Sequence, residues 1–164
     1  MEVLLYGFEF LLGYAITALA YYFNHRFLFH KRLPKQVPKL IRNWHKKYAN
    51  LHIRHHKHAW PEDEKVKEFI KVPLLGKIIL LLVVALISVA SIGASLGILV
   101  FFSVYGIRHG AIHGVSTVGN KVADSSSHYY RHHMLHHTNG NWHKHNFSGV
   151  HPWIDKVFGT YKES

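Results

Sequence analysis

Two apolar stretches of membrane length constrain the fold of this chain more than any other feature. Residues Val3–Phe23 carry one charge, Glu9, and a helix of that length is about 30 Å long, enough to cross a bilayer. The stretch Val72–Ile107 is too long for a single span, and the Ser and Gly residues in its middle weaken a helix. We therefore expect three apolar segments, namely a span and then a helical hairpin that turns near Gly93.

A cleavable signal peptide is the alternative for the first stretch. No basic residue precedes it, and no small-residue cleavage site follows its aromatic end at Phe23, so we expect a retained span. In the polar remainder, the pattern predicts helices at about Leu40–Trp60 and Ser126–His137, with mostly loop after Thr138. The predicted fold is all-α, a single membrane-embedded domain over residues 1–164 with a helical, His-rich cap.

The basic residues indicate how the chain lies in the membrane. Thirteen of the twenty Lys and Arg residues fall between Asn24 and Lys71, and none lies at the expected hairpin tip. By the positive-inside rule, the cap then faces the cytoplasm, and the tip faces outward. The net charge of +11 is also typical of nucleic-acid-binding proteins, but its position beside apolar segments favours a membrane surface and no nucleic acid.

Histidine is the residue type most informative about chemistry. Of the seventeen histidines, ten form four clusters next to the apolar segments. They are His25, His30, His52, His55, His56, His109, His113, His133, His136 and His137. Residues three and four apart share a helix face, and imidazole suits iron, zinc, copper and nickel. Ten nitrogens match two adjacent ions with four or five ligands each. For the other seven histidines we expect surface roles; they are His45, His58, His128, His132, His143, His145 and His151.

Compositional bias and metal transport fit the histidine pattern less well than a metal centre does. Bias does not account for a spacing that repeats, with HxxHH occurring twice. A metal transporter would place ionisable ligands inside its spans, whereas these spans carry only Glu9 and, near an edge, Lys77. A His-rich membrane metal-binding or transport protein remains a distant alternative. The absence of cysteine excludes disulfides, iron–sulfur clusters and Cys-type zinc sites.

The four clusters together resemble the motifs of the fatty acid hydroxylase (sterol desaturase-like) superfamily, and most closely those of the fatty acid 2-hydroxylases. The similar segments are residues 25–30 (HRFLFH), 52–56 (HIRHH), 109–113 (HGAIH) and 133–137 (HMLHH). Residues 153–160 (WIDKVFGT) resemble the signature that closes these proteins. The chain departs from the pattern at Gly114, where many members have histidine, and at Phe147, where an Asn-Tyr-Gly motif has tyrosine.

The resemblance implies an integral membrane oxygenase of the endoplasmic reticulum or of a bacterial or archaeal inner membrane. Its cofactors would be two iron ions, with zinc possible in a purified sample, and dioxygen would be the co-substrate. All ten clustered histidines fall on positions that the family uses for metal. A ligand histidine also needs an acceptor for its second ring nitrogen. Our candidates are Asp155, Asn146 and Asp124, followed by Asn120 and Asn141.

The four histidine clusters are expected at the cytoplasmic ends of the helices, just above the hydrocarbon. This position favours oxidation of a lipid near its head end. We therefore expect 2-hydroxylation of an acyl chain that lies between the helices. A desaturase, or a member of the superfamily that oxidises a sterol, carotenoid or aldehyde, is the alternative. The sequence has no dinucleotide motif, haem-attachment motif or cysteine, so a separate reductase and small carrier are expected to deliver electrons.

Overall fold

Helices form all the regular secondary structure in the part of the chain that the computed structural model describes, which is residues 2–60, 62–66, 74–115, 127–138 and 142–163. The predicted all-α fold is therefore confirmed. The elements are α1 (Glu2–Phe23), a π-helix η1 (Asn24–Phe29), α2 (Lys39–Lys57), α4 (Leu74–Ala90), α5 (Ile92–Ile112), α7 (His128–His137) and α8 (Pro152–Val157).

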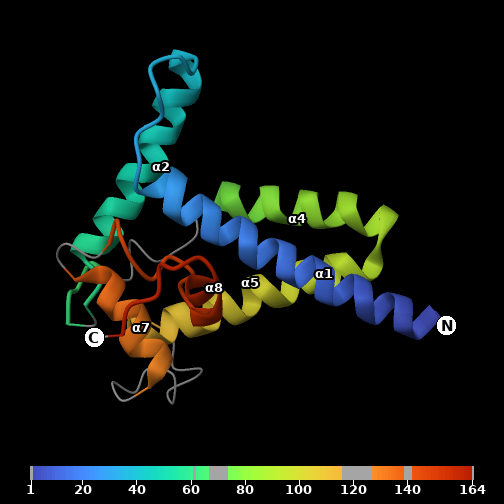
Figure 1. Cartoon of the computed structure of the whole chain (residues 1–164). Helices are drawn as coiled ribbons and strands as arrows, with labels where there is room; N and C mark the ends of the chain where they lie inside the picture. The colour runs from blue at the N-terminus through green and yellow to red at the C-terminus, as the bar shows by residue number, and fades with distance from the viewer. Residues whose placement is uncertain (1, 61, 67–73, 116–126, 139–141, 164) are drawn as a thin grey trace.

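The helices fall into an elongated part and a cap (Figure 1). Helices α1, α4 and α5 form the elongated part, with the amino terminus at its far end. Helices α1 and α5 run side by side, and α4 forms a hairpin with α5. Helices α2, α7 and α8 gather at the end of this part that is remote from the amino terminus. This arrangement confirms a span followed by a hairpin.

The apolar helices have the character of membrane spans. Glu2–Phe29, which joins α1 to η1, and α5 are long and apolar enough to cross a bilayer, and Gly76–Ala90 of α4 is a shorter apolar helix. Only 11% and 33% of the apolar windows of the two long helices are buried. The core helix of a water-soluble protein would be mostly covered, so these exposed apolar surfaces fit a lipid environment.

The hairpin turns at Ser91, two residues before the predicted position. The Ser91 hydroxyl caps α5 by accepting a hydrogen bond from the Ala94 N–H at 3.0 Å. The same hydroxyl donates to Oε2 of Glu9 on α1 at 2.7 Å. Glu9, the one carboxylate inside the first span, is therefore hydrogen-bonded to Ser91, the residue that precedes α5. This bond ties the tip of the hairpin to α1.

Glycines allow α1 and α5 to approach until their backbones touch. A Cβ atom at Gly97 would collide with the Phe10 carbonyl of α1, and a Cβ atom at Gly13 would collide with the backbone of Ala94. Small residues at helix interfaces are typical of packing in lipid, where close backbone contact replaces the hydrophobic effect as the driving force. The interface between these two helices is therefore closed.

Gly97→Ala should lower the thermal stability of the detergent-solubilised protein. Overpacking of this kind costs about 1–3 kcal/mol, more than the gain in helix propensity from Gly to Ala. Gly106→Ala on the same helix is the matched control, because a Cβ atom there meets nothing within 4 Å. A melting temperature for Gly97→Ala equal to or above that of Gly106→Ala would contradict the close contact.

The carboxyl-terminal segment, expected to be mostly loop, contains a short helix and contributes to the core of the cap. Phe147 and Ile154 are buried in one cluster with Tyr22 of α1 and Phe101 of α5. A short helix has no periodicity that a sequence pattern can reveal, and the burial of Phe147 depends on its distant partners. The π-helix η1 was not predicted either, and α7 begins two residues later than expected.

Candidate metal centre

The structure gathers the clustered histidines into two groups. The first histidine group consists of His25, His30, His52, His56 and His136. The second histidine group consists of His55, His109, His113 and His133. Within each group, one ring nitrogen from every member lies within 4.8 Å of the others. Nine of the ten predicted ligands are therefore placed where their nitrogens converge.

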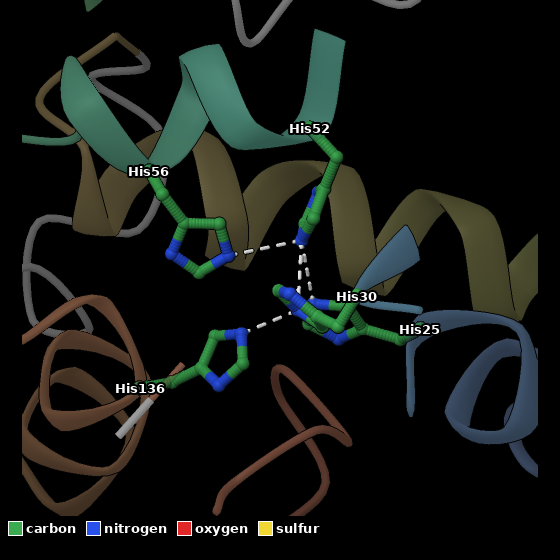
Figure 2. Close-up of side chains that lie close together, drawn as sticks. All are labelled: His25, His30, His52, His56 and His136. Atoms are coloured by element: carbon green, nitrogen blue, oxygen red, sulfur yellow. Dashed lines mark hydrogen bonds between the residues drawn. The ribbon is translucent and has the colours of Figure 1, made fainter. Parts of the chain in front are cut away.

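In the first histidine group, the rings meet through their Nε2 atoms (Figure 2). The Nε2 atom of His52 lies 2.9 Å from that of His25, 3.2 Å from that of His30 and 3.0 Å from that of His56. The Nε2 atom of His136 lies 3.1 Å from that of His25. Two imidazole nitrogens that bind one ion at right angles, each about 2.1 Å away, lie about 3.0 Å apart. The spacing matches a shared ion.

The second histidine group has a similar spacing, and His137 adjoins it. The Nε2 atom of His133 lies 3.0 Å from that of His113 and 3.0 Å from that of His137. The His137 ring is also 4.8 Å from the His55 ring and 4.4 Å from the ring of His56. The tenth predicted ligand thus contacts the second group and lies at the boundary with the first.

The two HxxHH segments contribute to both groups in opposite ways. On α2, His52 and His56 are four residues apart and share a face toward the first group, whereas His55 joins the second. On α7, His133 belongs to the second group, and His137, four residues later, contacts it. His136 belongs to the first group. Each helix therefore links the two groups.

The π-helix η1 explains the spacing of the first cluster. Residues five apart do not share a face on an α-helix, yet His25 and His30 belong to one group, with ring centroids 5.0 Å apart. In η1 the backbone bonds run from residue i to i+5, which widens the turn and aligns these two positions. The local helix type, rather than the spacing alone, brings the pair together.

Main-chain carbonyls determine which nitrogen of several rings carries the proton. The Nδ1 atom of His25 lies 2.5 Å from the Phe147 carbonyl oxygen, and that of His136 lies 2.7 Å from the His145 carbonyl oxygen. Nδ1 of His113 lies 2.5 Å from the carbonyl oxygen of Ala59. Because a carbonyl only accepts, each Nδ1 donates a proton, and the Nε2 atom of a neutral ring carries a lone pair.

This protonation pattern fits a cation. The Nε2 atoms of His25 and His136 are 3.1 Å apart, and two lone pairs do not form a hydrogen bond with each other. A metal ion that both nitrogens bind would satisfy them. The donor set is five imidazoles in the first group and four in the second, which His137 adjoins, and it therefore suits a first-row transition metal.

Burial keeps the rings in the form that binds metal. It lowers the pKa of His30 to about 2, with His25 adding to the effect, and it lowers the pKa of His113 to about 4. The pKa values of His52, His133 and His136 are also well below the usual range, first because of burial and then because of the neighbouring histidines. At neutral pH these rings are uncharged, as metal ligation requires.

Residues 10–160 match the family model described as fatty acid hydroxylase. The chain belongs to the fatty acid hydroxylase family. Among curated proteins and among solved structures, nothing matches the chain. The family is a group of metal-dependent oxidoreductases, so the chain is an enzyme of that class, and two histidine groups that could bind metal are consistent with it. The match is to the family as a whole and does not distinguish the 2-hydroxylases from its other members.

The residues expected to orient the ligands in this hydroxylase act through the backbone. We expected the side chains of Asp155 and Asn146 to accept hydrogen bonds from ligand rings, but main-chain carbonyls accept from the Nδ1 atoms of His25, His113 and His136 instead. The buried Asp155 carboxylate accepts from the N–H groups of Phe147, at 2.8 Å, and Ser148, at 3.0 Å. Asp155 thus holds the residue whose carbonyl accepts from His25. Asp124, Asn120 and Asn141 lie outside the described residues.

Asn146 stabilises the same segment. Its side-chain nitrogen donates to the carbonyls of His132, at 3.0 Å, and Lys162, at 3.1 Å, and its oxygen accepts from the Lys162 N–H at 2.8 Å. Its φ of 59° lies in the left-handed region, which Asn tolerates better than most residues. His145 and Phe147 flank Asn146 in this turn. The His145 carbonyl accepts from His136, and the Phe147 carbonyl accepts from His25.

Three of the seven histidines expected at the surface are buried instead. His132 lies 3.1 Å from Asp155 through Nε2, His45 lies 2.5 Å from the Leu28 carbonyl, and His151 lies 3.2 Å from the Tyr14 hydroxyl. None of the three belongs to either histidine group among the described residues. Each supports the cap, and no sequence spacing distinguishes such a residue from a ligand.

Two aromatic residues that sequence reasoning did not predict cover the first group. The Phe147 ring, 2% exposed, lies 5.5–6.0 Å from the rings of His25, His30 and His136. The half-buried Trp142 lies 5.2 Å from the ring of His56 and 5.7 Å from that of His30. These rings limit the access of water to the first histidine group. The place of Phe147 in a family motif was the only signal in the sequence.

Proposed function

We propose that this hydroxylase binds two iron ions through its ten clustered histidines and hydroxylates a lipid acyl chain near its head end, most simply at C2. The observation that supports the proposal is the convergence of two histidine groups at one end of two membrane-length helices. A metal site at the end of the spans lies at the level of lipid head groups rather than in the middle of the acyl chains.

The ions would be held by the first histidine group and by the second group with His137. When bound, a pair of redox-active ions would pass electrons from the external donor to dioxygen, which no amino acid side chain can do alone. The chain's own residues keep the Nε2 lone pairs of His25 and His136 available, because main-chain carbonyls accept hydrogen bonds from their Nδ1–H groups. Phe147 and Trp142 exclude water, which suppresses side reactions of activated oxygen.

The sequence led us to expect an acyl chain between the helices. The α1–α5 interface is not available for it, because glycine contacts close that interface. Exposed apolar side chains at the cap end of the first span, namely Phe23, Phe27 and Leu28, offer a surface for it instead. A lipid that approaches along this surface presents its head end to the first histidine group. We therefore keep head-end oxidation as the proposed outcome.

Purified protein should contain about two equivalents of transition metal per chain, measured by elemental analysis. Ten converging imidazoles are too many for one ion. Iron is the proposed metal in the cell, although zinc can occupy the site in a recombinant sample because metal availability often decides occupancy. One equivalent or fewer after careful loading with iron would contradict two sites.

The cap should face the cytoplasm and the hairpin tip the opposite side, since the basic residues cluster between Asn24 and Lys71. The chain has no native cysteine, so Ile92→Cys at the exposed tip and Glu163→Cys on the exposed cap report each side separately. An impermeant thiol reagent added to intact cells should label only the tip. Labelling of Glu163→Cys alone would reverse the proposed orientation.

Reconstitution tests the activity itself. Protein with dioxygen and NAD(P)H alone should be inactive, and adding a reductase and a small electron carrier should yield a 2-hydroxyacyl product. Mass spectrometry then separates the outcomes, since hydroxylation adds one oxygen and desaturation removes two hydrogens. A desaturated product, or a product oxidised at mid-chain, would overturn the proposed reaction while leaving the family unchanged.

A further inference from the structure

Arg26 lies at the cap end of the first span without an acidic partner. Its Nη1 donates to the Tyr22 hydroxyl at 2.7 Å, and its Cζ lies 5.1 Å from the centroid of the Phe27 ring and 5.8 Å from the rings of Tyr22 and Phe147. The side chain is half-buried, and no carboxylate contacts it within the part of the chain that the structure describes. Its position is therefore fixed by neutral groups.

The guanidinium group retains most of its capacity to bind an anion. It carries five N–H donors in a planar fork, and Tyr22 uses one. The ammonium of Lys31 lies 4.9 Å from the centroid of the same Phe27 ring, so a second cation shares this surface. Carboxylate oxygens match the guanidinium fork and form its strongest hydrogen bonds.

An exposed aromatic row adjoins Arg26. The ring of Phe158 lies 5.2 Å from that of Phe23, which stacks on Phe27 at 6.1 Å. These three side chains are 37–42% exposed, and Val157, which precedes Phe158, is 70% exposed. The row provides the apolar surface that an acyl chain requires, next to a fixed cation.

The Phe147 ring connects this surface to the metal centre. It lies 5.8 Å from the Cζ of Arg26 and 6.0 Å from the His25 ring. Arg26 also follows His25 directly in the sequence. An anion held by Arg26 is therefore one aromatic ring away from the first histidine group.

We propose that Arg26 and the aromatic row of Phe158, Phe23 and Phe27 bind a free fatty acid, with its carboxylate on the guanidinium and its chain along the row. The assignment rests on the proposed function, because oxidation near the head end requires a head group anchored close to the metals. A carboxylate places C2 one bond from the anchored carbon, whereas a phosphate ester would place several bonds between the anchor and the acyl chain.

Palmitate binding to the purified protein in neutral detergent, measured by native mass spectrometry, tests the proposal. Arg26→Gln should weaken palmitate binding about tenfold or more, as expected for the loss of charge-assisted hydrogen bonds. Arg26→Lys, which keeps the charge but not the fork, should fall between. Arg32→Gln is the matched control, because it removes the same charge from an exposed position a few residues away and should change nothing.

Two further ligands separate the parts of the site. Methyl palmitate should bind weakly and equally to the wild type and to Arg26→Gln, and acetate should bind to neither. Equal binding of palmitate to the wild type and Arg26→Gln would overturn the site, as would equal binding of palmitate and its methyl ester to the wild type. Because these measurements require no turnover, palmitate binding through Arg26 with no hydroxylated product on reconstitution would refute only the proposed function.

Discussion

Alanine in place of His136 abolishes lipid oxidation and empties the first histidine group of metal; this is the largest effect that we expect from a single substitution. The ring meets His25 through Nε2 at 3.1 Å, and its Nδ1 proton is held by a carbonyl. Removing it deletes one nitrogen from a five-member group. The loss should exceed the 10–100-fold effect typical of a residue that only supports a ligand.

A comparison within α2 sharpens this expectation. His52→Ala should deplete the ion of the first group and His55→Ala that of the second, although the two residues are only three positions apart. Each variant should retain about one equivalent of metal by elemental analysis and have no detectable activity. His113→Ala should behave as His55→Ala does.

His58→Ala and His151→Ala are the controls, since neither residue belongs to a histidine group among the described residues. Both should retain most of the activity and both metal equivalents. If His58→Ala were as metal-poor and inactive as His55→Ala, the assignment of the first HxxHH segment would be wrong.

Asp155→Asn should cause the second-largest effect, a loss of stability of about 3–5 kcal/mol, as expected when a buried charged partner is removed. Burial alone would raise the pKa of Asp155, but hydrogen bonds from His132, Ser148 and Thr160 hold that pKa below its ordinary value. Each carboxylate oxygen accepts from more than one donor. The amide nitrogen of Asn, placed at either oxygen position, would itself be a donor and would face other hydrogen-bond donors.

Thermal unfolding and activity measurements check the prediction. Activity should fall by roughly 10–100-fold, since the Phe147 carbonyl that orients His25 loses its support. Asp63→Asn is the control, because that carboxylate lies near the surface, where the pairing with His58 contributes little to stability. Equal stability of the two variants would show that Asp155 does not hold the cap together.

The lowered pKa also sets the pH dependence of this contribution. Because the folded-state pKa of Asp155 is below the ordinary value, the carboxylate stabilises the folded protein above about pH 4. The contribution is lost as the pH falls through the folded-state pKa. Asp155→Asn should therefore differ most from the wild type at neutral pH and converge with it in acid.

Local pattern was enough to predict most of the architecture. The apolar stretches predicted a span and a hairpin, because the length of a helix that crosses a bilayer follows from its rise per residue. The repeated HxxHH spacing predicted convergent ligands, since residues three and four apart share a helix face. These regularities are properties of one helix at a time, so the sequence alone reveals them.

The tertiary structure decided everything that depends on contacts between distant segments. Only the placement of α2 beside α7 shows that each HxxHH segment divides its histidines between two groups, and only the π-helix aligns His25 with His30. Asp155 acts through the backbone of Phe147, eight residues earlier, and Arg26 lies beside Phe27 and Phe147 without an acidic partner in the described structure. A spacing rule specifies the face of a helix, but which side chain or carbonyl meets that face is set by the packing of other helices and loops.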